Sequence, residues 1–402
     1  MTEQDLDVYR SEGLRLSQAD LMVENVISTF RLPNAVAVNF LINGVDRLIP
    51  MVVEEPSVVA AVSNMARLTR QSGGFFAEAD ASIMIGQIQL AKVSNPERCI
   101  AALNAAIPEL KEVARTVHPR LEERGGGIRD FDIRQVRFDE GEDTEDMVVL
   151  HFHMDCVDAM GANMVNTVAE RLAPYIEART GETVGLKILS NLADKRLARA
   201  YVELEPEHIA SDGMDAVQLA ERIESAWRFA WADPYRAATH NKGVMNGIDA
   251  VCLATGNDWR AIEAGAHAWC ARDGQYRPMT RWTFKNGILR GEIELPTQFG
   301  IVGGPIRVHP TVQSNLRMMR VETARELAAI AAAVGLAQNL GALRALASEG
   351  IQAGHMRMHA RTVAATAGAT AIEVPYITAR LVDERNFSVE RARVILAEFR
   401  KD

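Results

Sequence analysis

Cysteine is scarce in this sequence, and its few copies do not form a recognisable pattern. The four cysteines, Cys99, Cys156, Cys252 and Cys270, lie far apart, without any Cys-x-x-Cys unit. Thiolate zinc sites use such close pairs, and small disulfide scaffolds need a denser framework. We therefore expect buried free thiols, and neither a disulfide framework nor a thiolate zinc site.

Long apolar runs and dense basic runs are also lacking. The small-apolar run from Leu327 to Ala337 is far too short to cross a membrane. The first residues, MTEQDLD, are polar and acidic, unlike a signal peptide. With a net charge of −9 and no dense Lys/Arg run, the chain lacks the basic stripe that nucleic-acid phosphates require. We expect a soluble cytoplasmic protein that binds neither membranes nor nucleic acids.

Three common catalytic signatures are absent. Without Gly-x-Gly-x-x-Gly there is no Rossmann fingerprint, and without Gly-x-Ser-x-Gly a nucleophilic role for Ser57 has no support. Two histidine pairs could suggest a metal: His355 with His359 at helical spacing, and His151 with His153 at strand spacing. Neither pair has a His-Glu-x-x-His motif or an evident third ligand. We therefore predict no metal site.

The sequence does have the length and apolar content of a multi-domain globular protein. Its 402 residues are 48% hydrophobic, enough for more than one core and for two or three domains. Near the start, Glu54-Glu55-Pro56-Ser57 precedes an apolar run from Val58 to Ala66, which predicts a helix start with acidic residues at its positive end. A carboxyl group desolvated there could instead donate a proton near neutral pH. The local sequence leaves both interpretations open.

Residues 82–190 alternate between strand and helix patterns. Their order, strand-helix-strand twice over, predicts a small α+β module of the split βαβ kind. The predicted elements are strand 84–90, helix 96–117, strand 131–138, strand 147–154, helix 160–176 and strand 183–189. Asp158-Ala-Met-Gly-Ala-Asn163 joins a strand to a helix, where Gly161 permits close backbone approach and the helix N-terminus can receive an anion. Taken alone, Asp158 is more often a helix cap.

The stretch from Asp233 to Trp259 combines isolated charges with small residues. It contains Arg236, Lys242 and Asp258 among Gly, Asn and Ala. The apolar spacing predicts two successive helices, with Lys242 at the start of the first and Asp258 at the start of the second. A lysine at that position opposes the helix dipole unless an anion faces it, whereas an aspartate there is an ordinary cap. This stretch is therefore the strongest candidate for a site.

Six blocks of the sequence, taken together, resemble a known family. In chain order they are Glu24-Asn-Val-Ile27, Pro50-Met-Val-Val-Glu-Glu-Pro-Ser57, Asp158-Ala-Met-Gly-Ala-Asn163, Asp233-Pro-Tyr-Arg-Ala-Ala-Thr-His-Asn-Lys-Gly243, Thr255-Gly-Asn-Asp258 and Gly354-His-Met356. These blocks look like the signatures of 3-hydroxy-3-methylglutaryl-coenzyme A reductase, specifically the bacterial class II, degradative type. They occur in family order and cover nearly the whole chain.

The resemblance implies a reversible, NAD(P)-dependent interconversion of mevalonate plus coenzyme A and 3-hydroxy-3-methylglutaryl-CoA, without a metal. Its catalytic residues match Glu55, Lys242, Asp258 and His355. Hydride addition to the thioester builds negative charge on oxygen, which the Lys242 ammonium would stabilise. Asp258 would orient that lysine, Glu55 would exchange a proton with the substrate oxygen, and His355 would protonate the departing CoA thiolate.

The resemblance also implies further contacts, a fold and an assembly. Arg236 would hold the substrate carboxylate, and the other polar contacts to substrate would be Ser57, Asn191 and Asn246. Asp158, Met160, Gly161 and Asn163 would line the dinucleotide site. The fold would be a multi-domain α+β fold: a large α-rich CoA and substrate domain (1–81 and 191–349), an inserted ferredoxin-like, non-Rossmann dinucleotide-binding domain (82–190) and a C-terminal helical flap (350–402). Members form homodimers or dimer-based hexamers, with the site shared between subunits.

The sequence determines the choice between NAD and NADP, and the physiological direction of the reaction, less clearly than it determines the reaction itself. Class II character favours NAD, and Glu122 and Glu123 would repel the 2′-phosphate of NADP, but His118, Arg120 and Arg124 could accept it. We expect NAD, with NADP possible, and the mevalonate-oxidising direction, although no residue sets that direction. The alternatives are a CoA-thioester hydrolase or lyase, or a non-catalytic CoA- or nucleotide-binding protein.

Overall fold

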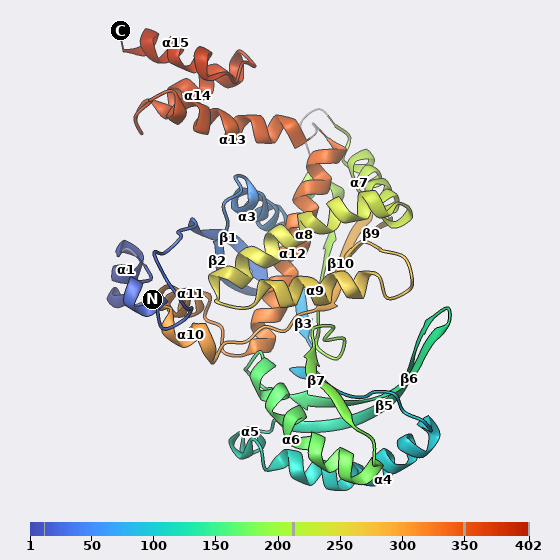
Figure 1. The fold of residues 1–402 in the computed structure, drawn as a ribbon. Coiled ribbons are helices and arrows are strands. Elements are labelled where there is room, and N and C mark those ends of the chain that lie inside the picture. Colours follow the sequence, from blue (N-terminus) through green and yellow to red (C-terminus); the bar gives the residue numbers. More distant parts are fainter. Residues whose placement is uncertain (12, 211–213, 349–350, 401–402) are drawn as a thin grey trace.

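The fold is organised around one long helix, α12 (Ala324–Ala347), which runs through the centre of the largest part of the molecule (Figure 1). A computed structural model describes residues 1–11, 13–210, 214–348 and 351–400. Within those ranges α12 alone is long and apolar enough to cross a membrane, but 83% of its apolar window is buried inside the protein. Its small residues let neighbours pack closely: a Cβ on Gly335 would lie 2.8 Å from Ile248.

A four-stranded antiparallel sheet and several helices surround α12. The strand order is β3 (Phe76–Ala79), β8 (Leu197–Leu204), β10 (Ile288–Pro296) and β9 (Thr280–Lys285). Alternate residues of β10 are buried, as expected for a sheet with one face on the core. The hairpin of β1 (Asn34–Ile42) and β2 (Val45–Val52) completes this core together with four helices, α3 (Val58–Thr69), α7 (Ala216–Ala232), α8 (Pro234–Ala254) and α9 (Trp259–Cys270).

Shorter elements lie at the edge of this large region. Helix α1 (Glu3–Arg10) is fastened to α11 (Pro310–Met319) because the buried Asp5 carboxylate accepts hydrogen bonds from Arg317 and, at 2.9 Å, from Ser314. The remaining short helices are α2 (Leu16–Ala19), η1 (Arg70–Ser72), η2 (Pro206–Ile209) and α10 (Gly304–Val308).

A second core belongs to a small module in the middle of the chain. Its elements are β4 (Ile83–Leu90), α4 (Pro96–Arg115), α5 (Pro119–Glu123), β5 (Gly127–Glu140), β6 (Asp143–Asp155), α6 (Ala162–Thr180) and β7 (Val184–Ser190). The strands pair antiparallel in the order β5-β6-β4-β7, and both long helices pack on one side of the sheet (Figure 1). This is the ferredoxin-like arrangement, so the expected multi-domain α+β fold is confirmed.

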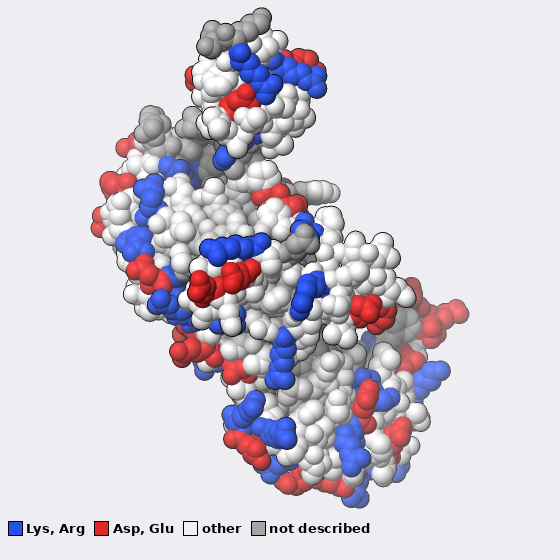
Figure 2. Space-filling model, turned by 90° about the vertical axis from the view of Figure 1, so that its left-hand side faces the viewer, with Lys and Arg blue, Asp and Glu red and all other residues white. Residues whose placement is uncertain are grey.

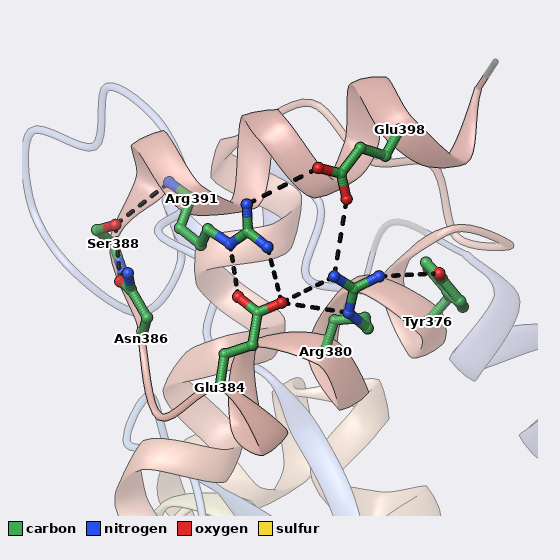
Figure 3. A network of polar contacts seen from close by, with 7 residues as sticks. All are labelled: Tyr376, Arg380, Glu384, Asn386, Ser388, Arg391 and Glu398. Carbon is green, nitrogen blue, oxygen red and sulfur yellow. Dashed lines mark hydrogen bonds and ion pairs between the residues drawn. The ribbon is translucent and has the colours of Figure 1, made fainter.

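A third, small core lies at the C-terminus. Helices α13 (Ile351–Thr366), α14 (Val374–Asp383) and α15 (Val389–Phe399) pack on one another around Ile377, Leu381 and Ile395. The bundle stands away from the large region, beyond the end of α12 (Figure 1). On its surface Glu384 accepts hydrogen bonds from Arg380 and Arg391 (Figure 3).

Candidate active site

A lysine on α8 and a glutamate before α3 form the centre of the candidate site. Lys242 Nζ donates to Glu55 Oε2 at 2.7 Å, and Asn246, one turn further along α8, donates to the same oxygen at 3.4 Å. Both partners of the ion pair remain accessible, with 61% of the Lys242 side chain and 34% of the Glu55 side chain exposed. The arrangement places an ammonium beside a carboxylate where a ligand can reach both.

The structure corrects the predicted position of Lys242. The sequence pattern placed Lys242 at a helix start, but α8 begins at Pro234, and Lys242 lies in its third turn. Proline suits a first helical position, and the Asp233 side chain caps the helix by accepting from the Tyr235 amide at 3.1 Å. The helix dipole therefore does not explain the environment of Lys242. The anion that faces the lysine is Glu55.

Two further polar groups, one on α8 and one just before α3, have no protein partner in the described part of the chain. Arg236, in the first turn of α8, makes no ion pair there, and burial lowers the pKa of its guanidinium. Ser57 immediately precedes α3 with a left-handed backbone (φ 77°), and its buried hydroxyl has no hydrogen-bond partner among the described residues. A cation and a hydroxyl left unsatisfied in this way suit a polar, anionic ligand.

Asp258 and Asn191 lie in a second group, near α9. Asp258 caps α9, as predicted, by accepting from the Ala261 amide at 3.1 Å, and it lies 3.4 Å from Arg260. The Asn191 backbone carbonyl packs against Gly265 of α9. Helix α8 separates this group from the first, because Lys242 and Ala254 are about 18 Å apart along its axis at roughly 1.5 Å of rise per residue. Within one chain, Asp258 therefore does not reach Lys242.

The loop from Asp158 to Asn163 is clamped between the small module and the large region. The Asp158 carboxylate accepts from the Ala324 amide at the start of α12 (2.9 Å), so part of its role is structural. Buried Arg196 donates to the carbonyls of Ala159 (3.3 Å) and Met160 (3.1 Å), and burial lowers its pKa to about 10. No sequence motif pointed to Arg196, since it lies far from this loop in the chain.

The same loop leaves the N-terminus of α6 open to a ligand. Gly161 precedes the helix with φ 102°, and a Cβ there would lie 2.3 Å from the Cys156 sulfur, so only glycine fits. Asn163 is exposed in the first turn. The helix N-terminus carries partial positive charge and free amide donors, which fits the anionic pyrophosphate of a dinucleotide.

His355 cannot be joined to this geometry. It belongs to helix α13, but its side chain lies outside the described residues. Among those that are described, no group of three His, Cys, Asp or Glu side chains could hold a metal ion.

Comparison with known proteins decides the family. Residues 1–360 match the family model described as hydroxymethylglutaryl-coenzyme A reductase. The chain belongs to this family. The 3-hydroxy-3-methylglutaryl-coenzyme A reductase of Archaeoglobus fulgidus is 47% identical over 401 residues, which is 100% of this chain and 90% of that protein. A probable enzyme of the same name from Borreliella burgdorferi is 35% identical over 85% of this chain and 77% of its own length.

Solved structures agree with the sequence relatives. The class II 3-hydroxy-3-methylglutaryl-CoA reductase of Streptococcus pneumoniae, bound to NADPH in open conformations, superposes with a TM-score of 0.83 at 41% identity, covering 100% of this chain and 96% of that one. A second structure of the Streptococcus pneumoniae enzyme gives a TM-score of 0.84 at 40% identity, covering 99% and 94%. The family predicted from six blocks is confirmed, and the chain is a hydroxymethylglutaryl-coenzyme A reductase, an oxidoreductase that uses a nicotinamide cofactor. The hydrolase, lyase and non-catalytic alternatives do not fit this family.

Proposed function

We propose that Lys242, Glu55, Asp258 and His355 catalyse the interconversion of mevalonate plus coenzyme A and 3-hydroxy-3-methylglutaryl-CoA. The contact between Lys242 and Glu55 supports this proposal most directly, because it joins two residues 187 positions apart in the sequence. The ammonium stabilises negative charge that develops on the substrate oxygen, and the carboxyl exchanges a proton with that oxygen. His355, which belongs to α13 of the C-terminal bundle, protonates the thiolate of the departing coenzyme A.

The groups without protein partners around this pair define the substrate end of the site. Arg236 binds the free carboxylate of the substrate, and Ser57 and Asn246 provide polar contacts beside it. Asn191 contributes from the second group. In this proposal residues 1–81 and 191–349 form the substrate domain, 82–190 the dinucleotide domain and 350–402 the flap.

The two groups of site residues meet, in this proposal, through a second copy of the chain. The segment just before β1 exposes four large apolar side chains, Leu21 (80%), Val23 (59%), Ile27 (93%) and Phe30 (91%). Together with Leu253 and Asn315 it lines a cavity of about 910 Å³. Figure 2 faces this N-terminal side of the molecule, where uncharged surface lies between scattered Lys, Arg, Asp and Glu side chains. A homodimer covers this face and brings Asp258 of one copy towards Lys242 of the other; a hexamer would be built from such dimers.

The dinucleotide lies, we infer, against the open N-terminus of α6. When bound, the nicotinamide supplies or accepts the hydride. Asp158, Met160, Gly161 and Asn163 shape that site, and Glu122 lies against Gly127 at the neighbouring glycine-rich turn. A carboxylate there favours NAD by repelling a 2′-phosphate, whereas exposed Arg120 and Arg124 favour NADP. We propose NAD, and mevalonate oxidation in the cytoplasm as the physiological direction, with the NADPH-bound Streptococcus pneumoniae relative supporting NADP as the second candidate.

One assay tests the reaction and the cofactor together. Purified protein is mixed with mevalonate and coenzyme A, and with either NAD or NADP, and absorbance of the reduced nicotinamide is followed. We expect kcat/KM to be higher with NAD than with NADP. Glu122→Gln, which removes the carboxylate that repels the 2′-phosphate, should reduce the ratio of the two kcat/KM values. A higher kcat/KM for NADP would reverse the cofactor assignment, and no signal with either cofactor would reject the proposed reaction. The reverse assay, which starts from 3-hydroxy-3-methylglutaryl-CoA, compares the two directions.

A further inference from the structure

Two carboxyl groups meet between α8 and α9, close to the candidate site but outside it. Asp249 of α8 and Glu263 of α9 are hydrogen-bonded to each other, and both are partly buried. The Asp249 Oδ1 atom is buried and has no hydrogen-bond partner in the described structure. Two carboxylates this close cannot both stay ionised away from water, so at least one proton belongs to the pair.

Asp249 lies on the same face of α8 as the residues that hold Glu55. Lys242, Asn246 and Asp249 follow one another at helical spacing, i, i+4 and i+7. Side chains three positions apart have Cβ atoms about 5–6 Å from each other, so the Asp249 carboxyl can reach the Asn246 amide. Since Asn246 Nδ2 donates to Glu55, its Oδ1 is left as an acceptor, and the described residues provide no donor to it.

The surroundings keep Asp249 protonated at neutral pH. Burial first, and then the negative charge of Glu263, raise the pKa of Asp249 to about 8. The next turn of α8 carries the buried Cys252 thiol, whose pKa is raised by burial and then by Asp249 and Asp258. Arg260, on α9, is the cation that acts on this cluster within the described chain, and its effect on Cys252 is a small opposing one.

We propose that Asp249, in its neutral form, is a positioning residue of the active site. Its O–H donates to Asn246 Oδ1, which fixes the Asn246 amide so that Nδ2 holds the Glu55 carboxylate beside Lys242. Glu263 maintains the proton on Asp249. Ionisation of Asp249 removes the donor, frees the amide to turn, and loosens the Lys242–Glu55 pair.

The test compares pH profiles of kcat for three variants. Asp249→Asn carries a permanent neutral donor of the same shape, so its kcat at pH 7 should stay within about twofold of the parent while the alkaline decline near pH 8 disappears. Glu263→Gln removes the charge that keeps Asp249 protonated, so its decline should move to lower pH. Asp249→Ala should lower kcat roughly tenfold at pH 7, the effect of losing one hydrogen bond, and its kcat should approach that of the parent above pH 8, where the parent has lost the same donor.

Controls separate positioning from folding. Glu221→Gln, an exposed acid on α7, should reproduce the parent profile. Thermal melting of each variant reports folding, and because the alanine variant can lose stability, the asparagine and glutamine variants decide the question. An unchanged alkaline decline in Asp249→Asn, an unmoved decline in Glu263→Gln, or a parent rate that is flat from pH 7 to pH 9 would overturn the proposal.

Discussion

The Lys242–Glu55 ion pair shows how a contact of little value to the fold can be central to the chemistry. Both side chains are partly exposed, and ion pairs of this kind contribute at most about 1 kcal/mol to stability. Among the described residues the Lys242 side chain makes no other hydrogen bond or ion pair, and it projects from the surface of α8. Its removal should therefore separate function from stability.

Lys242→Ala should lower kcat by a factor on the order of 10² to 10³ or more, because a preorganised positive charge at a developing oxyanion is lost. The melting temperature should stay within about 2 °C of the parent, as expected for a change of well under 1 kcal/mol. The measurement is reduced-nicotinamide absorbance together with thermal melting. Lys285→Ala, an exposed lysine on β9, serves as the matched control and should leave both quantities unchanged. Retained activity in Lys242→Ala would remove this lysine from the site.

At the scale of elements, ion pairs between helices hold the C-terminal bundle together in addition to its small apolar core. Its apolar core is small, and Glu384 links α14 to α15 through Arg391 (2.7 Å) while also accepting from Arg380 on its own helix (Figure 3). Glu373, just before α14, accepts a hydrogen bond from Arg400 Nε, just after α15, at 2.7 Å, so it also joins these two helices. Arg391 and then Arg380 lower the pKa of Glu384 to about 2, and Arg400 lowers that of Glu373 to about 2.

The bundle should accordingly lose stability in acid. A carboxyl whose pKa is lower in the folded state stabilises that state above the unfolded pKa of about 4.5, and its contribution is lost as the pH falls towards about 2. The protection factors of α14 and α15 amides against hydrogen exchange, measured in the full chain relative to the intrinsic rate at each pH, should fall between these pH values before those of the large core do. In Glu384→Gln this pH dependence should be reduced, whereas Glu390→Gln, which alters an exposed acid of α15, should keep it. Equal acid sensitivity in the two variants would contradict the argument.

Local sequence patterns predicted those elements whose signals are themselves local. The order of strands and helices in 82–190 followed from alternating and helical periodicity, and Asp258 was identified as a cap because it directly precedes an apolar helical repeat. The start of α8 was missed because Asn241 and Gly243 resemble a break, although the buried Asn241 is satisfied by the Arg277 carbonyl and the Met279 amide. Arg277 and Met279 lie just before β9, far from α8 in the sequence, so the local sequence could not reveal these contacts. They allow the helix to continue through Asn241.

At the scale of the whole molecule, one helix length determines how the site can be assembled. Glu55, Lys242 and Asn246 gather near the middle of α8, while Asp258 follows its far end. The six blocks contain Glu55, Lys242 and Asp258, and the family resemblance added Asn246. A sequence does not state whether such residues meet within one copy or between two. The rigid rise of α8 rules out a meeting of Lys242 with Asp258 in one chain, so the proposed site needs two copies.

Mixing two inactive variants tests this composite site directly. Lys242→Ala and Asp258→Ala should each lack activity alone. In a mixed dimer, one site combines both substitutions, whereas the other combines the intact Lys242 of one copy with the intact Asp258 of its partner, so one of the two sites works. Random pairing of equal amounts gives half mixed dimers, and activity should recover to about a quarter of the parent value.

The recovery should appear only after subunit exchange or co-expression, and sedimentation of the mixture should show dimers. Mixing Lys242→Ala with Glu55→Ala is the matched control: Glu55 and Lys242 meet within one chain, so every site of that mixed dimer lacks one of them and no activity should return. Recovery in the control would show that Glu55 and Lys242 meet between copies and not within one chain. No recovery in the test pair despite proven mixed dimers would show that Asp258 does not act across the interface on Lys242.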